Sequence, residues 1–233
     1  MNIYISPHFD DAIGSCGCKI YQDHLNGKEA LVLTVFAKEI KEGFSSFARE
    51  LHELWGVKSP VTERRRENIQ ACKVLNTDIR NLNFTEAIYR KKDGRYLYEF
   101  SDSLFKGLHQ SDKKLEKRIL LKLKQYISSE DVCYFPSGRG GHVDHILVNN
   151  VGKRLAYENY KIVYYRDFYY QGEVYDGNRY ATKNKFFNKK CLEKKIEAMK
   201  QYKSQIDILF GDNTIEKYYK LEYQNGEVYY EEK

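Results

Sequence analysis

The chain alternates between short apolar runs and longer segments in which apolar residues recur at helical spacing. The short runs are almost continuously apolar, as expected for strands covered on both faces of a parallel sheet. The longer segments are typical of amphipathic helices. Strands that alternate with helices predict an α/β fold with a Rossmann-like, mostly parallel sheet flanked by helices. The predicted strands are residues 2–6, 29–36, 81–84, 132–135 and 162–165, and the predicted helices are residues 11–24, 62–75, 111–128, 142–157 and 189–209.

The end of the chain has a different pattern. Residues 218–230 alternate around Asn225-Gly226, which predicts a C-terminal β-hairpin with a type I′ turn. Residues 37–60 form a long polar connection after a predicted strand, and such connections often build a substrate pocket. The chain has no repeat, low-complexity tract or linker, so we expect residues 1–233 to form one domain.

Composition and segment lengths indicate the cellular compartment in which the protein is expected. No run approaches about eighteen consecutive apolar residues, so no transmembrane helix is expected. The chain enters a strand at once, without the basic and apolar regions of a secretory signal. Its five cysteines lack the spacing of a disulfide framework or a CxxC site. We therefore expect a cytoplasmic, bacterial protein with reduced cysteines.

The charge of the chain says little about its partners. The net charge of +6 is spread over 39 basic and 33 acidic residues. This balance permits an anionic substrate or a nucleic acid but demands neither. We expect no nucleic-acid partner, and no pattern in the chain indicates an oligomeric interface.

The first candidate site follows the first predicted strand. The sequence from Ser6 to Asp11 (SPHFDD) places one imidazole and two adjacent carboxylates where an open α/β sheet presents its chemistry. A hydrolytic zinc site needs three imidazole or carboxylate ligands and one position open to water. Because successive side chains diverge, one carboxylate can bind the metal while the other faces its water. The alternative is that His8 lies on the surface and that Asp10 or Asp11 caps the next helix.

A second cluster, from Gly138 to His145 (GRGGHVDH), follows the apolar run 132–136. The two clusters together hold three of the six histidines of the chain. His142 and His145 are neighbours on one face if a helix begins there. Two strand ends that each carry His and Asp can converge on one metal ion. A set of two His ligands and one carboxylate is then available, with Asp and His to spare for acid–base chemistry.

These two motifs resemble those of the PIG-L/LmbE-like family of zinc-dependent N-deacetylases, which show a His-Pro-Asp-Asp-Glu element and a later His-x-Asp-His element. The segment Arg64–Glu67 (RRRE) resembles the family's Arg-x-x-Glu helix, and the segment Lys195–Gln205 resembles its late Lys/Tyr/Ser-Gln segment. The resemblance spans residues 1–210. The chain departs from the common family pattern at three positions that hold no implied ligand or base: Phe9, Ala12 and Cys18.

The resemblance implies a role for each residue of the first motif. It implies that His8 and Asp11, together with His145, bind Zn²⁺, which lowers the pKa of a bound water and polarises the amide carbonyl. Asp10 would be the general base and would later pass the proton to the leaving amine. Fe²⁺ fits the same three ligands in cells.

The remaining implied roles lie in the second motif and in the Arg-x-x-Glu helix. Protonated His142 would stabilise the oxyanion, and Asp144 would orient His142 and raise its pKa. Arg64 would bind substrate hydroxyls or a phosphate, although an ion pair with Glu67 on a solvated face is the competing interpretation. The implied reaction is the hydrolysis of an N-acetyl group from a small amino-sugar conjugate, such as an N-acetylglucosamine derivative.

Two other classes of function fit part of the pattern. Non-haem Fe(II) oxygenases also use two His and one carboxylate, but their sites usually lie in β-barrels and give Asp10 and His142 no role. A non-catalytic sugar-binding protein on the same scaffold is the other alternative. Such a protein would be expected to have lost Asp10 or His142, and both are present.

Overall fold

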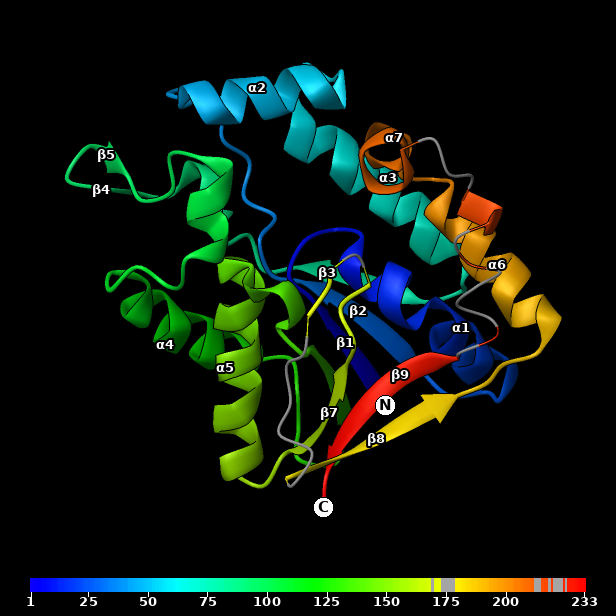
Figure 1. Cartoon of the computed structure of the whole chain (residues 1–233). Coiled ribbons are helices and arrows are strands. Elements are labelled where there is room, and N and C mark those ends of the chain that lie inside the picture. Colours follow the sequence, from blue (N-terminus) through cyan, green and yellow to red (C-terminus); the bar gives the residue numbers. More distant parts are fainter. Residues whose placement is uncertain (169, 173–178, 212–214, 218, 220–223, 225) are drawn as a thin grey trace.

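A computed structural model describes residues 1–168, 170–172, 179–211, 215–217, 219, 224 and 226–233. Seven strands form one sheet in the order β3-β2-β1-β6-β7-β9-β8 (Figure 1). The five strands from β3 to β7 pair in parallel, and β9 pairs antiparallel with both β7 and β8. The mostly parallel sheet is therefore confirmed. The strands are β1 (Asn2–Ser6), β2 (Ala30–Thr34), β3 (Asp78–Asn81), β6 (Val132–Pro136), β7 (Lys161–Tyr165), β8 (Tyr180–Lys185) and β9 (Glu227–Glu232).

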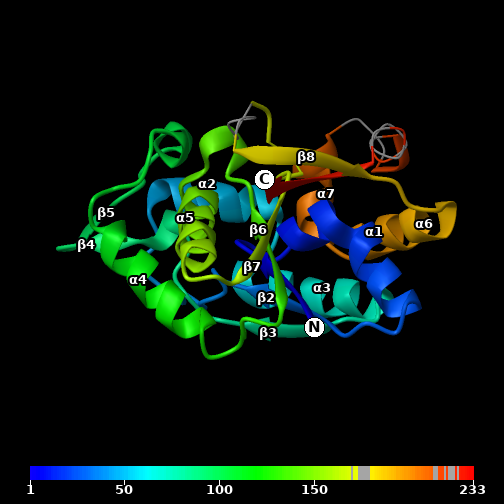
Figure 2. The ribbon, with the colours of Figure 1, turned by 90° about the horizontal axis from the view of Figure 1, so that it is seen from below.

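Helices cover both faces of the sheet. Figure 2 shows α4 and α5 on one face and α1, α3 and α6 on the other. The described part of the chain contains the helices α1 (Asp11–Leu25), α2 (Ser46–Trp55), α3 (Pro60–Val74), α4 (Asp112–Leu123), α5 (Val143–Tyr157), α6 (Lys189–Met199) and α7 (Lys203–Phe210). The described residues also include a small hairpin and three 3₁₀ turns: β4 (Lys91–Lys92), β5 (Arg95–Tyr96), η1 (Ala87–Tyr89), η2 (Ser101–Phe105) and η3 (Arg139–Gly141).

The apolar runs form strands because both of their faces are buried. In β1, Tyr4 packs into the core under α1 and α6, whereas Ile3 and Ile5 pack into the core under α4 and α5. The helix after β1 lies very close to α6, because a Cβ atom on Gly17 would come within 2.7 Å of the Lys195 side chain. A glycine at this position therefore permits the contact.

Before the C-terminal hairpin, three predicted segments differ from the observed ones. The strand predicted at residues 81–84 is β3 and lies at Asp78–Asn81. The connection 37–60 contains the helix α2, whose first turn is capped by the Ser45 hydroxyl and which ends at Gly56 with φ of 64°. The predicted helix 189–209 is two helices, α6 and α7, separated at Tyr202. The Tyr202 hydroxyl reaches into the core, where it lies within hydrogen-bond distance of the Phe9 carbonyl oxygen (3.0 Å) and of Asn68 Oδ1 (2.7 Å). A tertiary contact thus divides a segment that has the pattern of one helix.

The predicted C-terminal hairpin differs from the structure, because its second strand, β9, pairs with β7 and β8. Strand β9 pairs with β8, with Val228 opposite Asn184, and the described residue Gln224 is helical. Residues 218, 220–223 and 225 of the predicted hairpin lie outside the described residues. The alternating segment 227–232 therefore lies between β7 and β8, both of which come from distant parts of the chain.

Two expectations from composition can be compared with the structure. All five cysteines are buried, and none of them forms a disulfide. Within the described ranges, no helix has the length and apolar character that a membrane crossing requires.

The topology fixes where a site can form. Strand β1 lies between β2, which follows it in the chain, and β6, which follows much later. The chain therefore leaves β1 and β6 in opposite directions, and the carboxyl ends of these two strands border a crevice where ligands bind in open α/β folds.

Candidate active site

The two predicted clusters meet at the carboxyl ends of β1 and β6. His8 and Asp11 lie in the turn after β1 and at the start of α1, and His145 lies in the first turn of α5. Their ligand atoms lie within 4.8 Å of one another, and all three side chains are buried. A second set, in which His142 and Asp144 join His8, meets the same limit. The structure therefore brings together residues that are more than 130 positions apart in the chain.

Asp11 lies at the centre of the first set. Its Oδ2 accepts a hydrogen bond from the His8 backbone N–H (2.7 Å) and lies 3.3 Å from both His8 Nδ1 and His145 Nε2. Burial alone would raise the pKa of Asp11, but the two imidazoles outweigh it and hold that pKa well below the usual range. Asp11 is therefore a carboxylate, the form that a metal ion binds.

The donor set fits a divalent cation. Within the described part of the chain, His145 Nε2 is buried without a hydrogen-bond partner, although buried polar atoms almost always have one. It faces the carboxylate of Asp11, and His8 supplies a second imidazole. Two imidazole nitrogens and one carboxylate oxygen are ligands that zinc takes in hydrolytic sites. These residues thus have the chemistry and the proximity that a metal ion would need.

Asp10 lies against Arg64. The Arg64 guanidinium lies 3.6 Å from Asp10 Oδ1 and 3.5 Å from Glu86 Oε2. Burial and the neighbouring carboxylate of Asp11 raise the pKa of Asp10, against the opposing charge of Arg64. A carboxyl group with a raised pKa can both accept and release a proton near neutral pH.

Arg64 is buried at the site and does not lie on a solvated face. Its guanidinium stacks 5.0 Å from the Trp55 ring centroid, and Glu67 instead accepts the N–H (2.8 Å) and hydroxyl (2.7 Å) of Ser204. The competing interpretation of an exposed pair with Glu67 is therefore wrong. The structure places Arg64 against Asp10, where it orients the carboxylate.

His142 borders the cluster from the entry of α5. Its ring centroid lies 5.1 Å from that of His8 and 5.4 Å from that of His145. Its Nδ1 accepts the backbone N–H of Asp144 (3.2 Å). Burial and the positive charge of His8 hold the pKa of His142 well below its ordinary value. A neutral His142 whose Nδ1 accepts this hydrogen bond would carry its ring proton on Nε2.

The side chain of Asp144 has different partners from those predicted. Its carboxylate contacts His8 Nε2 (3.1 Å), accepts the N–H of Ala87 (2.9 Å) and forms an ion pair with Arg90. The Asp144 carboxylate raises the pKa of His142, as expected, but burial and the charge of His8 outweigh it. The hydrogen bond between the two residues comes from the Asp144 backbone N–H. The carboxylate instead orients His8.

The PIG-L family model, described as GlcNAc-PI de-N-acetylase, matches residues 3–156. The chain belongs to the PIG-L family. It is 30% identical to a 2'-N-acetylparomamine deacetylase of Niallia circulans, over 90% of this chain and 82% of that protein. Its fold matches the structure of a deacetylase–bog complex from teicoplanin biosynthesis with a TM-score of 0.86 and 25% identity, over 98% of this chain and 96% of that one. A zinc-inhibited form of teicoplanin deacetylase has the same fold (TM-score 0.83, 24% identity, 98% and 96% coverage).

The PIG-L match contains all seven predicted site residues, but another site residue lies beyond it. Asp167 Oδ1 lies 2.5 Å from His145 Nδ1, and Asp167 Oδ2 accepts the Ser137 hydroxyl (2.5 Å) and the Arg139 N–H (3.0 Å). Burial would lower the pKa of His145, but Asp11 and Asp167 outweigh it and raise that pKa to about 9. The signal for Asp167 was its place just after the predicted strand 162–165.

Glu86 and Arg90 were also missed by sequence reasoning. Both come from the segment between β3 and β4. Glu86 follows the predicted strand 81–84 by two residues, whereas Arg90 stands beside no motif or predicted strand. Their importance lies only in their partners, since Glu86 pairs with Arg64 and Arg90 pairs with Asp144.

Aromatic rings border the outer side of the PIG-L site. The Tyr170 ring lies 4.8 Å from His145 and 6.0 Å from His142, and Phe105 lies 5.5 Å from His142. The glycine-rich run makes room for this ring, because a Cβ atom on Gly140 would lie 2.5 Å from Tyr170 Cβ. The backbone of this run therefore lies close to Tyr170.

Proposed function

We propose that the protein is a metal-dependent N-deacetylase that hydrolyses the acetamide of a small amino-sugar conjugate. The observation that carries the proposal is the buried, unpartnered His145 Nε2, which faces Asp11 beside His8. Membership of the PIG-L family supports the reaction class, and the 2'-N-acetylparomamine deacetylase relative supports an amino-sugar substrate.

We assign the metal ligands to His8, Asp11 and His145. Zn²⁺ suits two imidazoles and a carboxylate, and Fe²⁺ fits the same set. When bound, the cation would supply a Lewis acid that polarises the amide carbonyl and makes water more acidic. Asp167 would fix the His145 ring so that Nε2 points to the cluster, because its bond occupies Nδ1.

Asp10 is the proposed general base. Its carboxylate lies next to the ligand Asp11 in sequence but turns toward Arg64. It would accept a proton from the attacking water and later deliver that proton to the leaving amine. Arg64, held between Asp10 and Glu86, would fix the position of the carboxylate; this role stands beside the substrate-binding role expected from the sequence.

His142 is the proposed stabiliser of the oxyanion. Because its Nδ1 accepts the Asp144 N–H, its Nε2–H remains to donate to the carbonyl oxygen of the substrate. A neutral imidazole can perform this task, so the role does not require the protonated ring expected from the sequence. Asp144 would act on the metal ligand His8 instead.

The rival classes receive less support. The non-haem Fe(II) oxygenase interpretation expects a β-barrel, whereas this chain is an α/β sheet flanked by helices. A non-catalytic sugar-binding protein has no need for a buried carboxyl group with a raised pKa beside the ligands.

The test measures metal content and acetate release in the same samples. Purified protein is stripped of metal, reloaded with Zn²⁺ or Fe²⁺, and offered a panel of N-acetylglucosamine conjugates. We expect one equivalent of metal and acetate release that depends on it. A protein that binds metal in a stoichiometric amount yet releases no acetate from any conjugate would contradict the substrate class. A protein that binds no metal would contradict the ligand assignment.

A further inference from the structure

A basic pocket lies beside the candidate active site at the carboxyl ends of β2 and β3. It has a volume of about 570 Å³ and is bordered by the turns after these strands and by the first part of α4. Among the described residues that line it, one side chain is acidic, that of Asp112. Its basic lining residues come from three separate segments: Lys38, Arg90, Lys91, Lys114 and Arg118.

The single carboxylate is already bound by the protein. Asp112 is buried and accepts hydrogen bonds from Arg90 Nη2 (3.0 Å) and from the Tyr98 hydroxyl (2.6 Å). Arg90 therefore cancels the charge of Asp112, and the remaining four cations have no carboxylate within the pocket. Because Arg90 also pairs with Asp144, the wall of this pocket is joined directly to the candidate active site.

The four remaining cations have no acidic partner in the described ranges of the chain. Lys91 is held by the Gly43 carbonyl (2.9 Å) and lies 4.3 Å from the Tyr96 ring centroid. Arg118 lies 5.8 Å from the ring centroid of Phe84, which also lines the pocket. These contacts hold positive groups at the pocket without neutralising them. Like charges around one cavity repel one another, and a bound anion relieves that repulsion.

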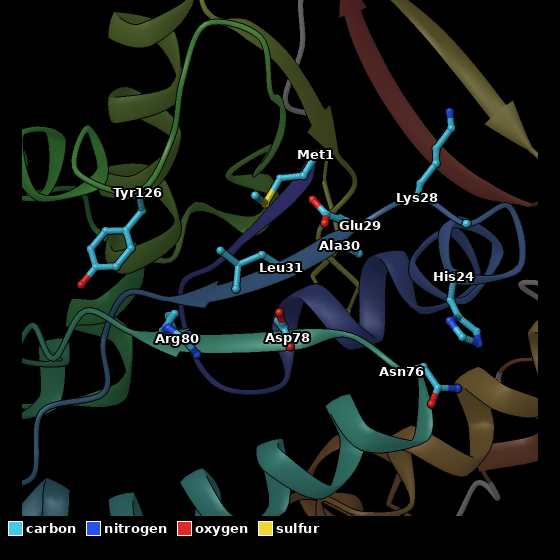
Figure 3. A pocket seen from close by; sticks show the side chains of 11 residues that line it. Met1, His24, Lys28, Glu29, Ala30, Leu31, Asn76, Asp78, Arg80 and Tyr126 are labelled. Atoms are coloured by element: carbon cyan, nitrogen blue, oxygen red, sulfur yellow. The ribbon is translucent and has the colours of Figure 1, made fainter.

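A second pocket of similar size provides a comparison within the same molecule. It also has a volume of about 570 Å³ and lies at the opposite, amino ends of β2 and β3 (Figure 3). Lys28 and Arg80 are balanced there by Glu29 and Asp78. The lining of this second pocket therefore has no such excess of basic over acidic side chains.

We propose that the basic pocket binds the phosphate group of a small phosphorylated molecule. A phosphate group has nearly two negative charges and three strong acceptor oxygens. It can therefore bind several ammonium groups and a guanidinium at once, whereas a carboxylate has one charge and two oxygens. The Ser111 hydroxyl also lines the pocket, and its buried Oγ has no hydrogen-bond partner among the described residues. It provides a neutral donor for a phosphate oxygen.

The phosphate group can belong to one of two kinds of molecule, and each predicts different kinetics. One is a phosphorylated carrier on the amino sugar, a source that rests on the proposed function. The other is a separate phosphorylated molecule that binds without being deacetylated and reaches the catalytic residues through Arg90 and Asp144.

The first experiment measures binding without relying on catalysis. Inorganic phosphate is titrated into ¹⁵N-labelled protein, and the amide shifts of α4 and of the turns after β2 and β3 are followed by NMR. The test variant is K114Q/R118Q, and the control is K113Q/K117Q. The control removes the same charge from exposed positions of the same helix that do not line the pocket. We expect the dissociation constant to rise about tenfold in the test variant and to stay unchanged in the control. Equal affinities in the two variants, or no saturable binding, would overturn the proposal.

The second experiment identifies the source. The KM of wild type and both variants is compared for N-acetylglucosamine 1-phosphate and for N-acetylglucosamine. A rise of about tenfold in the KM of K114Q/R118Q for the phosphorylated substrate alone identifies the carrier. Pocket-dependent phosphate binding with both KM values unchanged identifies a separate molecule. If neither wild type nor the variants release acetate from these substrates, the result counts against the proposed function. The NMR titration still tests whether the basic pocket binds phosphate.

Discussion

His145 and Asp167 form a buried pair in which Nδ1 of the imidazole lies 2.5 Å from a carboxylate oxygen. The pair joins the first turn of α5 to the chain just after β7. It leaves Nε2 as the nitrogen that faces Asp11 and the metal set. A residue beyond the PIG-L match thus determines which atom of a proposed ligand is available.

The first prediction concerns this pair. Replacing Asp167 with Asn keeps the size of the side chain but removes the charge that fixes the ring, so we expect metal affinity to fall about 10- to 100-fold. Competition with a chromogenic chelator measures that affinity. Asp207→Asn, an exposed change on α7, is the control and should leave it unchanged. An unaltered affinity in D167N would show that Asp167 does not position His145.

The second prediction separates the base from the ligands. We expect Asp10→Asn to lower kcat by about 10²- to 10⁴-fold, because an amide cannot accept the proton of the attacking water. Metal content should be unchanged, whereas Asp11→Asn should lose metal. Metal analysis and acetate release on the same samples provide both readouts. Full turnover in D10N would remove Asp10 from the mechanism.

The third prediction concerns the dependence of stability on pH. Burial would raise the pKa of Asp144, but the charge of Arg90 outweighs it and holds that pKa well below the usual range. A carboxyl group whose pKa is lower in the folded state than in the unfolded state stabilises the fold above its unfolded pKa of about 3.9. This contribution is lost as the pH falls toward the lower pKa of the folded state.

Asp144→Asn should therefore reduce the free energy of unfolding of the metal-free protein by about 3 kcal/mol at pH 7. The difference from wild type should shrink progressively below about pH 4. Urea unfolding of both proteins at several pH values measures it. A difference that stays constant as the pH falls would mean that the charge of Asp144 is not what stabilises the fold.

The fourth prediction concerns the glycine beneath Tyr170. Gly140 has φ of 78°, and an added Cβ would lie 2.5 Å from Tyr170 Cβ. Gly94 has the same φ of 78° with nothing within 4 Å of an added Cβ, so Gly94→Ala measures the backbone strain alone. We expect Gly140→Ala to be less stable than Gly94→Ala by about 1 kcal/mol or more, because Tyr170 must move as well.

Gly140→Ala should also raise KM, since Tyr170 contacts His142 and His145. Thermal unfolding and steady-state kinetics on the two variants test both effects. If the two alanine variants behave alike, the space that Gly140 leaves for Tyr170 has no consequence for the site.

Much of the fold could be predicted because its signals are local. Continuous apolar runs define β1, β2, β6 and β7, and helical repeats define α1, α3, α4 and α5, with ends displaced by a few residues. The alternation of strands and helices also predicts that the strands pair in parallel, since a crossover between parallel strands usually contains a helix. The break between α6 and α7 could not be predicted, because it depends on the contact of Tyr202 with Asn68 and Phe9.

The candidate site divides in the same way. The sequence by itself determined that His8, Asp10 and Asp11 follow one strand and that His142, Asp144 and His145 follow another, because motif residues and strand ends are local properties. Only the tertiary structure decided which of these side chains face one another. It turned Asp144 toward His8 and Arg90, placed Arg64 against Asp10, and added Asp167 to His145. These choices depend on long-range packing and on the competition of buried charges for partners, which no local pattern in the chain records.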